Sequence, residues 1–171
     1  MLWITPVVII IVLYTGILAL LYARQRSIVF RPDVTRADLA VAGLSEQMTE
    51  VEIRTADGLI LHSWWAPAIR PDGRVIVYFH GNAGHRGGRA DRIRDYLANG
   101  YGVLLVGYRG YGGNPGLLSE AGFYADARAN LAFLVAQKVR PDQIVLFGES
   151  LGTAVAVQMA LEQPALALVL E

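Results

Sequence analysis

Alternating and unbroken runs of hydrophobic residues predict the strands of this chain. Residues 48–55 alternate between apolar and polar positions, which predicts a half-buried strand, and residues 59–66 return as a second strand after the Asp57-Gly58 turn. Unbroken apolar runs are instead typical of strands buried on both faces of a parallel sheet. Such runs occupy residues 74–79, 103–106, 143–147 and 165–170. The pattern predicts one hairpin followed by parallel strands.

Three segments between these runs predict helices. Apolar residues recur at helical spacing in residues 85–99 and 119–136, and residues 153–161 are almost all apolar without glycine or proline. The two apolar stripes consist of Ala90, Ile93, Tyr96 and Leu97, and of Phe123, Ala127, Leu131 and Leu134. Strands that alternate with helices predict an α/β fold with a mostly parallel sheet and an N-terminal β-hairpin.

The N-terminal stretch from Leu2 to Tyr22 carries no charge. As a helix it would extend about 31 Å, enough to cross a bilayer core, with Trp3 and Tyr22 near the two interfaces. A cleaved signal peptide is the alternative, but no basic segment precedes the run, and the run is longer than the usual signal core. We therefore predict one transmembrane anchor over residues 1–23 that binds the lipid bilayer, a linker over 24–47 and a folded domain over 48–171.

Arginines follow the predicted anchor and none precedes it, which by the positive-inside rule places the folded domain on the cytoplasmic side. Four more arginines, Arg86, Arg89, Arg92 and Arg94, lie on the polar face of the helix expected at 85–99. We interpret that face as solvated, with local ion pairs. The alternative is a surface that rests on anionic lipid headgroups.

Composition excludes several classes of function. The net charge is zero, so there is no electrostatic basis for nucleic-acid binding. The chain has no cysteine, which excludes disulfides, a cysteine nucleophile and cysteine-ligated metal. The glycine-rich loop from Gly107 to Gly116 lacks the spacing of a dinucleotide fingerprint, and no P-loop lysine is present. We expect neither a metal nor a cofactor.

Ser150 lies between Gly148 and Gly152, directly after a predicted strand and before a predicted helix. This G-x-S-x-G spacing in a strand–turn–helix context is typical of a nucleophile elbow, where a sharp turn exposes a serine hydroxyl. A helix-capping serine is the alternative. A cap alone does not explain both glycines, so we predict that Ser150 is a nucleophile.

These motifs together resemble the α/β-hydrolase superfamily. The resemblance covers residues 51–171 and is greatest to the membrane-anchored, serine-aminopeptidase-like branch, which contains lipases, lysophospholipases and depalmitoylases. It rests on four motifs in order: Asp57-Gly58, His80-Gly81-Asn82-Ala83-Gly84, Tyr108-Arg109-Gly110-Tyr111-Gly112 and Gly148-Glu149-Ser150-Leu151-Gly152. The resemblance implies an α/β-hydrolase fold and a serine hydrolase.

The resemblance also implies residue roles. The N–H groups of Leu151 and Asn82 are expected to form the oxyanion hole. His80 is expected to orient its loop rather than take a proton. Other residues shape the site: Gly81, Gly148 and Gly152 allow close approach, Tyr108 and Arg109 brace a loop, and Tyr111 lines an acyl pocket.

The sequence departs from the family after Ser150, where it has no histidine or aspartate. The carboxylates beyond Ser150 are Glu162 and Glu171. The family order is serine, acid, histidine, so the resemblance implies a chain cut short at its C-terminus, without two strands, the acid and the base. We expect this 171-residue form to be nearly inactive and residues 165–170 to form an exposed apolar edge.

Two function classes follow from the sequence. The first is a membrane serine hydrolase that cleaves acyl esters, thioesters or peptides through an acyl-enzyme. The second is a catalytically silent module of the same fold that binds a lipid or protein. A third arrangement, in which another chain supplies the missing half, also remains open.

Overall fold

A computed structural model of the protein describes residues 4–171, except for the side chains of residues 4, 26 and 27. Trp3, which was predicted to lie at a membrane interface, is outside the described residues. The chain divides into two compact units, Met1–Arg31 and Pro32–Glu171.

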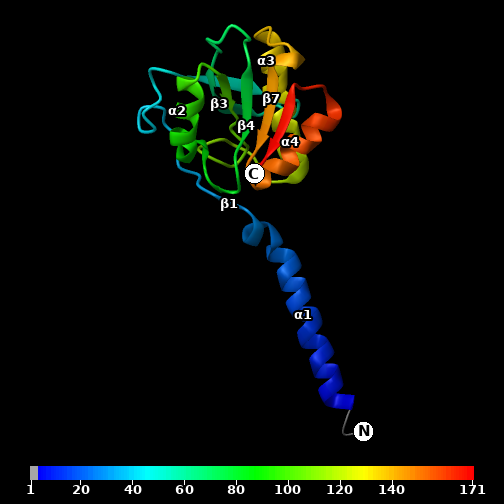
Figure 1. Cartoon of the computed structure of the whole chain (residues 1–171). Coiled ribbons are helices and arrows are strands. Elements are labelled where there is room, and N and C mark those ends of the chain that lie inside the picture. The colour runs from blue at the N-terminus through cyan, green and yellow to red at the C-terminus, as the bar shows by residue number, and fades with distance from the viewer. Residues whose placement is uncertain (1–3) are drawn as a thin grey trace. The chain divides into compact units, whose positions relative to one another are not determined.

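The first unit contains helix α1 (Ile4–Val29), shown in Figure 1. Within it, the 21-residue stretch Thr5–Gln25 is long enough and apolar enough to cross a membrane, and its most apolar part is not buried inside the protein. The hydroxyl of Thr15 donates to the carbonyls of Ile11 and Val12, so this polar side chain is satisfied within the helix. The helix fits a single-pass anchor.

The second unit contains a six-stranded sheet with helices on both faces (Figure 1). The strand order is β2-β3-β6-β4-β7-β8, in which β2, β3 and β6 pair antiparallel and β6, β4, β7 and β8 pair parallel. The sheet strands are β2 (Thr49–Arg54), β3 (Ile60–Ala66), β4 (Val75–Phe79), β6 (Gly102–Leu105), β7 (Ile144–Gly148) and β8 (Ala167–Leu170). This confirms the predicted hairpin and mostly parallel sheet.

The helices of the second unit are α2 (Ala90–Ala98), α3 (Glu120–Ala136) and α4 (Leu151–Glu162). Two short 3₁₀ helices, η1 (Arg86–Arg89) and η2 (Pro141–Gln143), and two short strands, β1 (Arg31–Pro32) and β5 (Ala83–Gly84), complete the elements. The helix predicted over 85–99 is therefore shorter than expected, because Gly87 and Gly88 disfavour regular α-helix at its start.

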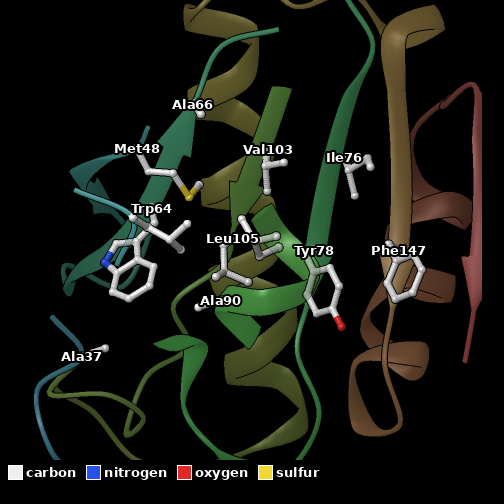
Figure 2. Packing of buried hydrophobic residues seen from close by; sticks show 12 residues of the cluster. Ala37, Met48, Trp64, Ala66, Ile76, Tyr78, Ala90, Val103, Leu105 and Phe147 are labelled. Carbon is white, nitrogen blue, oxygen red and sulfur yellow. The ribbon is translucent and has the colours of Figure 1, made fainter. Parts of the chain in front are cut away.

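One face of the sheet carries a continuous apolar cluster (Figure 2). Trp64 of β3 lies opposite Leu105 of β6 in the strand register, Leu105 lies opposite Tyr78 of β4, and Tyr78 lies opposite Phe147 of β7. The Tyr78 and Phe147 rings stack with centroids 4.8 Å apart. Ile93 of α2 is fully buried in the same cluster, so α2 covers this face.

Helices α3 and α4 cover the opposite face. The predicted stripe of α3 is buried, with Phe123, Ala127, Leu131 and Leu134 at most 2% exposed. Val155, Ala156 and Met159 of α4 are buried too. The serine-bearing turn precedes α4, so both ends of that turn are anchored in the core.

The linker expected over 24–47 does not form one connector. Helix α1 continues to Val29, because arginine and glutamine are good helix formers. Residues from Pro32 onward belong to the folded unit, where Ala37 and Leu44 are buried. The segment has no regular hydrophobic period, which is why the sequence did not reveal this packing.

Strand β8 lies at the edge of the sheet, and all four of its residues are exposed. Leu168, Val169 and Leu170 are 40–50% exposed, although their apolar run is typical of a buried strand. The exposed apolar edge expected from the sequence is therefore present, and such edges favour pairing with another strand.

Candidate active site

Ser150 occupies a strained turn between β7 and α4. Its backbone has φ 50° and ψ −112°, and it forms the N-cap of α4 with an exposed side chain. Among the described residues only Lys138 and Ser150 have positive φ without being glycine. Such a conformation costs about 1–3 kcal/mol and persists where the surrounding structure enforces it. The geometry is that of a hydroxyl held clear of the sheet.

The two glycines around Ser150 are required by close backbone contacts. A Cβ at Gly148 would come within 2.6 Å of the carbonyl oxygen of Gly152 and of the Cα of Thr153. A Cβ at Gly152 would overlap with the carbonyl of Phe79, its carbon 2.6 Å away. The turn therefore packs directly on the end of β4, and no larger residue fits at either position.

The loop after β4 meets the serine-bearing turn. The N–H of Glu149 donates to the carbonyl of Phe79 at 3.0 Å, and a Cβ at Gly152 would lie 3.0 Å from the carbonyl oxygen of His80. The loop after β6 reaches the same place, because the Tyr111 hydroxyl donates to Oδ1 of Asn82 at 2.9 Å. The loops that follow β4, β6 and β7 therefore meet at one place.

His80 is fully buried beneath this loop. Its Nδ1 lies 2.8 Å from the carbonyl oxygen of Gly81, and its ring packs against Tyr108 and Tyr111 with centroids 4.6 and 5.3 Å away. Burial lowers the pKa of His80 to about 3, so the ring is neutral near pH 7. These contacts suit a residue that orients the loop.

Tyr111 is buried behind the loop that carries Asn82. It is 1% exposed, and burial raises its pKa to about 12, so its hydroxyl stays protonated and can donate to Asn82. The side chain thus fixes Asn82, and its expected role in lining an acyl pocket stays a prediction.

The expected oxyanion donors lie on either side of this junction. Asn82 is half-buried in the loop after β4, and Leu151 is half-buried at the first turn of α4. Within residues 4–171, no protein hydrogen bond from the Leu151 N–H is found. Helix N-terminal N–H groups of this kind favour negative charge.

Arg109 contacts one buried and one exposed carboxylate from the loop after β6. Its guanidinium binds Asp126 of α3 (Nη2–Oδ1 2.7 Å) and Asp57 of the hairpin turn (Nη1–Oδ2 2.8 Å). The neighbouring Tyr108 is fully buried against Phe123, with ring centroids 5.0 Å apart. Both side chains pack beneath the loop, and their role in bracing it stays a prediction.

A family model described as serine aminopeptidase, S33, matches residues 70–170 of the chain. This span contains the strained serine, the loop around Asn82 and the glycine-rich loop. The chain belongs to this family of α/β hydrolases.

Individual relatives agree with the family match. An uncharacterised protein of Mycobacterium tuberculosis, Rv2307c, is 40% identical over 168 residues, which cover 96% of this chain and 59% of that protein. The zebrafish (Danio rerio) lysophosphatidylserine lipase ABHD12 is 37% identical over 98 residues, covering 56% of this chain and 25% of its own length. The crystal structure of an α/β hydrolase from Vibrio vulnificus matches with a TM-score of 0.64 at 28% identity, over 76% of this chain and 47% of that one.

The chain thus spans about three-fifths of the length of its mycobacterial relative. In the described part of this α/β-hydrolase-fold chain, no histidine hydrogen-bonds to Ser150. His62 lies beside Glu50 with Nδ1 3.3 Å from Oε1, His80 packs against the tyrosines, and Nδ1 of His85 accepts from the N–H of Gly87. His80 thus packs beneath the loop around Asn82, and His85 caps the 3₁₀ helix η1.

The side chains of the two acidic residues after Ser150 pair with arginines rather than with a histidine or Ser150. Glu162 pairs with Arg128 of α3, and the carboxylate of Glu171 pairs with Arg92 of α2. The backbone of Glu171 nevertheless reaches the turn, where its carbonyl accepts from the Ser150 N–H at 2.7 Å.

Three of the four arginines expected on a solvated face instead contact residues distant in the sequence. Arg86 is 1% exposed and pairs with Glu50 of β2. Arg89 pairs with Glu149, 60 residues away, and Arg92 donates to Tyr78 and Glu171. Arg94 pairs locally with Asp91, as expected. Residues so far apart in sequence give no local signal of pairing, so sequence reasoning missed the Arg89–Glu149 contact.

Proposed function

We propose that this protein is a serine hydrolase of acyl esters in which Ser150 is the nucleophile. The observation that carries the proposal is the exposed, strained serine between two glycines that no larger residue can replace. Strain at such a position persists because the core holds both sides of the turn, which is typical of a functional site.

In the proposed reaction, Ser150 Oγ attacks the acyl carbonyl carbon as a base removes the hydroxyl proton. The N–H groups of Leu151 and Asn82 stabilise the tetrahedral oxyanion, and loss of one such donor costs about 10²–10³ in kcat in comparable sites. The alcohol or thiol leaves with a proton, and water then attacks the acyl-enzyme, which releases the acid. The proposal requires a histidine and an acid from outside these 171 residues.

The proposed substrates are acyl esters of membrane lipids. Support comes from the relative named as a lysophosphatidylserine lipase and from helix α1, which would hold the domain at a bilayer. Thioesters and peptides pass through the same acyl-enzyme chemistry and remain within the proposal.

Active-site labelling tests the nucleophile. Membranes containing the protein produced from its complete gene are treated with a fluorophosphonate probe, which phosphonylates activated serines. We expect labelling of the wild type and of Ser45→Ala, an exposed serine outside the site, and none of Ser150→Ala. Equal labelling of Ser150→Ala and the wild type contradicts the proposal.

A catalytically silent binding module is the second candidate. It is favoured by the fact that no histidine in the described residues bonds to Ser150. Absence of labelling in a folded wild-type protein supports this candidate over the hydrolase.

We further propose that the domain lies on the cytoplasmic side, because Arg24, Arg31 and Arg36 follow the anchor. These 171 residues contain no cysteine, so Ser45→Cys adds a reporter whose signal is read against the unsubstituted protein treated in parallel. An impermeant maleimide should label this cysteine only after cells are permeabilised. Labelling of intact cells contradicts the orientation.

A further inference from the structure

Arg89 joins the two segments that carry the expected oxyanion donors. Its Nε and Nη2 donate to the Glu149 carboxylate at 3.0 and 2.7 Å, next to Ser150 in the sequence. Its Nη1 donates to the carbonyl oxygen of Ala83 at 2.8 Å, next to Asn82. One planar guanidinium therefore bridges the ends of β4 and β7.

The surrounding residues fit closely around this bridge. A Cβ at Gly81 would come within 2.9 Å of Oε1 of Glu149 and 3.3 Å of Nη2 of Arg89, so glycine lets the ion pair lie against the loop. The Tyr78 hydroxyl donates to the other Glu149 oxygen at 2.8 Å. The Glu149 carboxylate is thus held from two sides, and a bidentate arginine fixes it in orientation as well as position.

The bridge also balances charge beside the nucleophile. Burial alone would raise the pKa of Glu149, but hydrogen bonds from Arg89 and Tyr78 hold it below its usual value, so this half-buried residue is ionised. An unpaired carboxylate so close to Ser150 would oppose the negative charge that develops on the substrate oxygen. Arg89 supplies the compensating positive charge.

We propose that Arg89 is a positioning residue that fixes the Asn82 and Leu151 N–H groups relative to each other and neutralises Glu149. The inference rests on the proposed function, since it concerns the same site. A misplacement of about 1 Å at a catalytic group lowers rates about 10²-fold. Loss of the bridge should therefore lower kcat while substrate binding away from the oxyanion remains.

Kinetics on a p-nitrophenyl ester test this role in the protein produced from its complete gene. We expect Arg89→Met to lower kcat by about 10–100-fold with KM within about twofold, and Arg89→Lys to fall between Arg89→Met and the wild type. The double variant Arg89→Met/Glu149→Gln should recover at least about threefold over Arg89→Met, because the unpaired charge is removed. The matched control is Arg128→Met. It breaks a bidentate pair between Arg128 of α3 and Glu162 at the end of α4, and it should leave kcat unchanged.

Amide hydrogen exchange tests the positioning without relying on turnover. We expect Arg89→Met to speed exchange in residues 80–84 and 149–152 at least about tenfold, with the central strands unchanged, and Arg128→Met to leave both segments as in the wild type. Wild-type kcat or unchanged exchange in Arg89→Met overturns the inference, as does a double variant no faster than Arg89→Met. A wild-type protein that is not labelled by the fluorophosphonate probe and does not hydrolyse the ester overturns the proposed function instead. The exchange result alone then tests whether Arg89 positions the two segments.

Discussion

Arg109 and Arg89 are two of the arginines that bind carboxylates in this domain, and their surroundings differ. The side chain of Arg109 is 8% exposed, and that of its partner Asp126 is fully buried behind the glycine-rich loop. The side chains of Arg89 and Glu149 are 14% and 24% exposed at the serine-bearing turn. The Arg109 guanidinium links its loop to α3 through Asp126 and to the hairpin turn through Asp57. The Arg89–Glu149 pair instead links two loop segments of the candidate site.

This difference in burial decides what each pair contributes. Breaking a buried pair leaves an uncompensated charge and costs about 3–5 kcal/mol, whereas a partly exposed pair contributes about 0–1 kcal/mol. Loss of the Arg109 contacts should therefore lower mainly the stability of the domain. Loss of the Arg89 pair should change mainly the geometry of the serine-bearing turn.

The largest predicted effect is that of Arg109→Met. The buried Asp126 carboxylate then keeps its hydrogen bond from the backbone N–H of residue 109 (2.8 Å) but loses the positive charge of the guanidinium. We therefore expect the free energy of unfolding to fall by about 3–5 kcal/mol. Urea denaturation of the purified protein measures this change. A loss below about 1 kcal/mol would place the Arg109 contacts in the same class as the exposed pairs.

The second predicted effect is a loss of stability in mild acid that comes from His80. Because its pKa in the folded protein is about 3, well below the unfolded value near 6.5, the unfolded chain binds a proton that the folded chain does not. Stability should therefore fall as the pH drops below about 6.5, by about 2 kcal/mol between pH 6.5 and 4.5.

The matched variant for this test is His80→Asn, whose stability should depend less on pH over the same range. Asp57 cannot produce the effect, since Arg109 holds its pKa at about 2 and its contribution is lost only below about pH 4. Denaturant midpoints of both proteins from pH 7 to 4.5 make the comparison. Parallel curves for the two proteins would contradict a buried, neutral His80.

The sequence predicted those features of the site that depend on neighbouring residues. The turn around Ser150 was predictable because strand, glycines and helix adjoin one another, and the sheet was predictable from unbroken apolar runs. The strand order was not predicted, since periodicity does not specify which strands pair.

The features that were missed depend on contacts distant in sequence. Arg89 and Glu149 are 60 residues apart, and both look like ordinary surface charges in the sequence. Tyr111 carries an aromatic ring suited to a pocket, and only its hydrogen bond to Asn82 reveals a bracing role. Leu44 is buried in a segment without any hydrophobic period.

The third predicted effect concerns the backbone contact between the serine-bearing turn and β4. Gly152→Ala would place a Cβ against the carbonyl of Phe79, and we expect a loss of about 1–3 kcal/mol in unfolding free energy together with loss of fluorophosphonate labelling. Gly88→Ala is the matched control, because nothing lies within 4 Å of its added Cβ. A labelled, stable Gly152→Ala protein would contradict the close packing of the turn.

The smallest predicted effect is that of Arg89→Met on stability, which completes the comparison with Arg109. Both variants remove a guanidinium and keep an unbranched apolar side chain of similar length. Because the Arg89 pair is partly exposed, we expect its loss to lower the free energy of unfolding by less than about 1 kcal/mol, close to the effect of breaking the exposed Arg128–Glu162 pair. Urea denaturation of Arg89→Met, Arg109→Met and Arg128→Met in the same buffer measures all three. If Arg89→Met destabilises the protein as much as Arg109→Met does, the Arg89 pair is a structural support of the fold, and any loss of turnover in that variant would then follow from unfolding rather than from a displaced oxyanion hole.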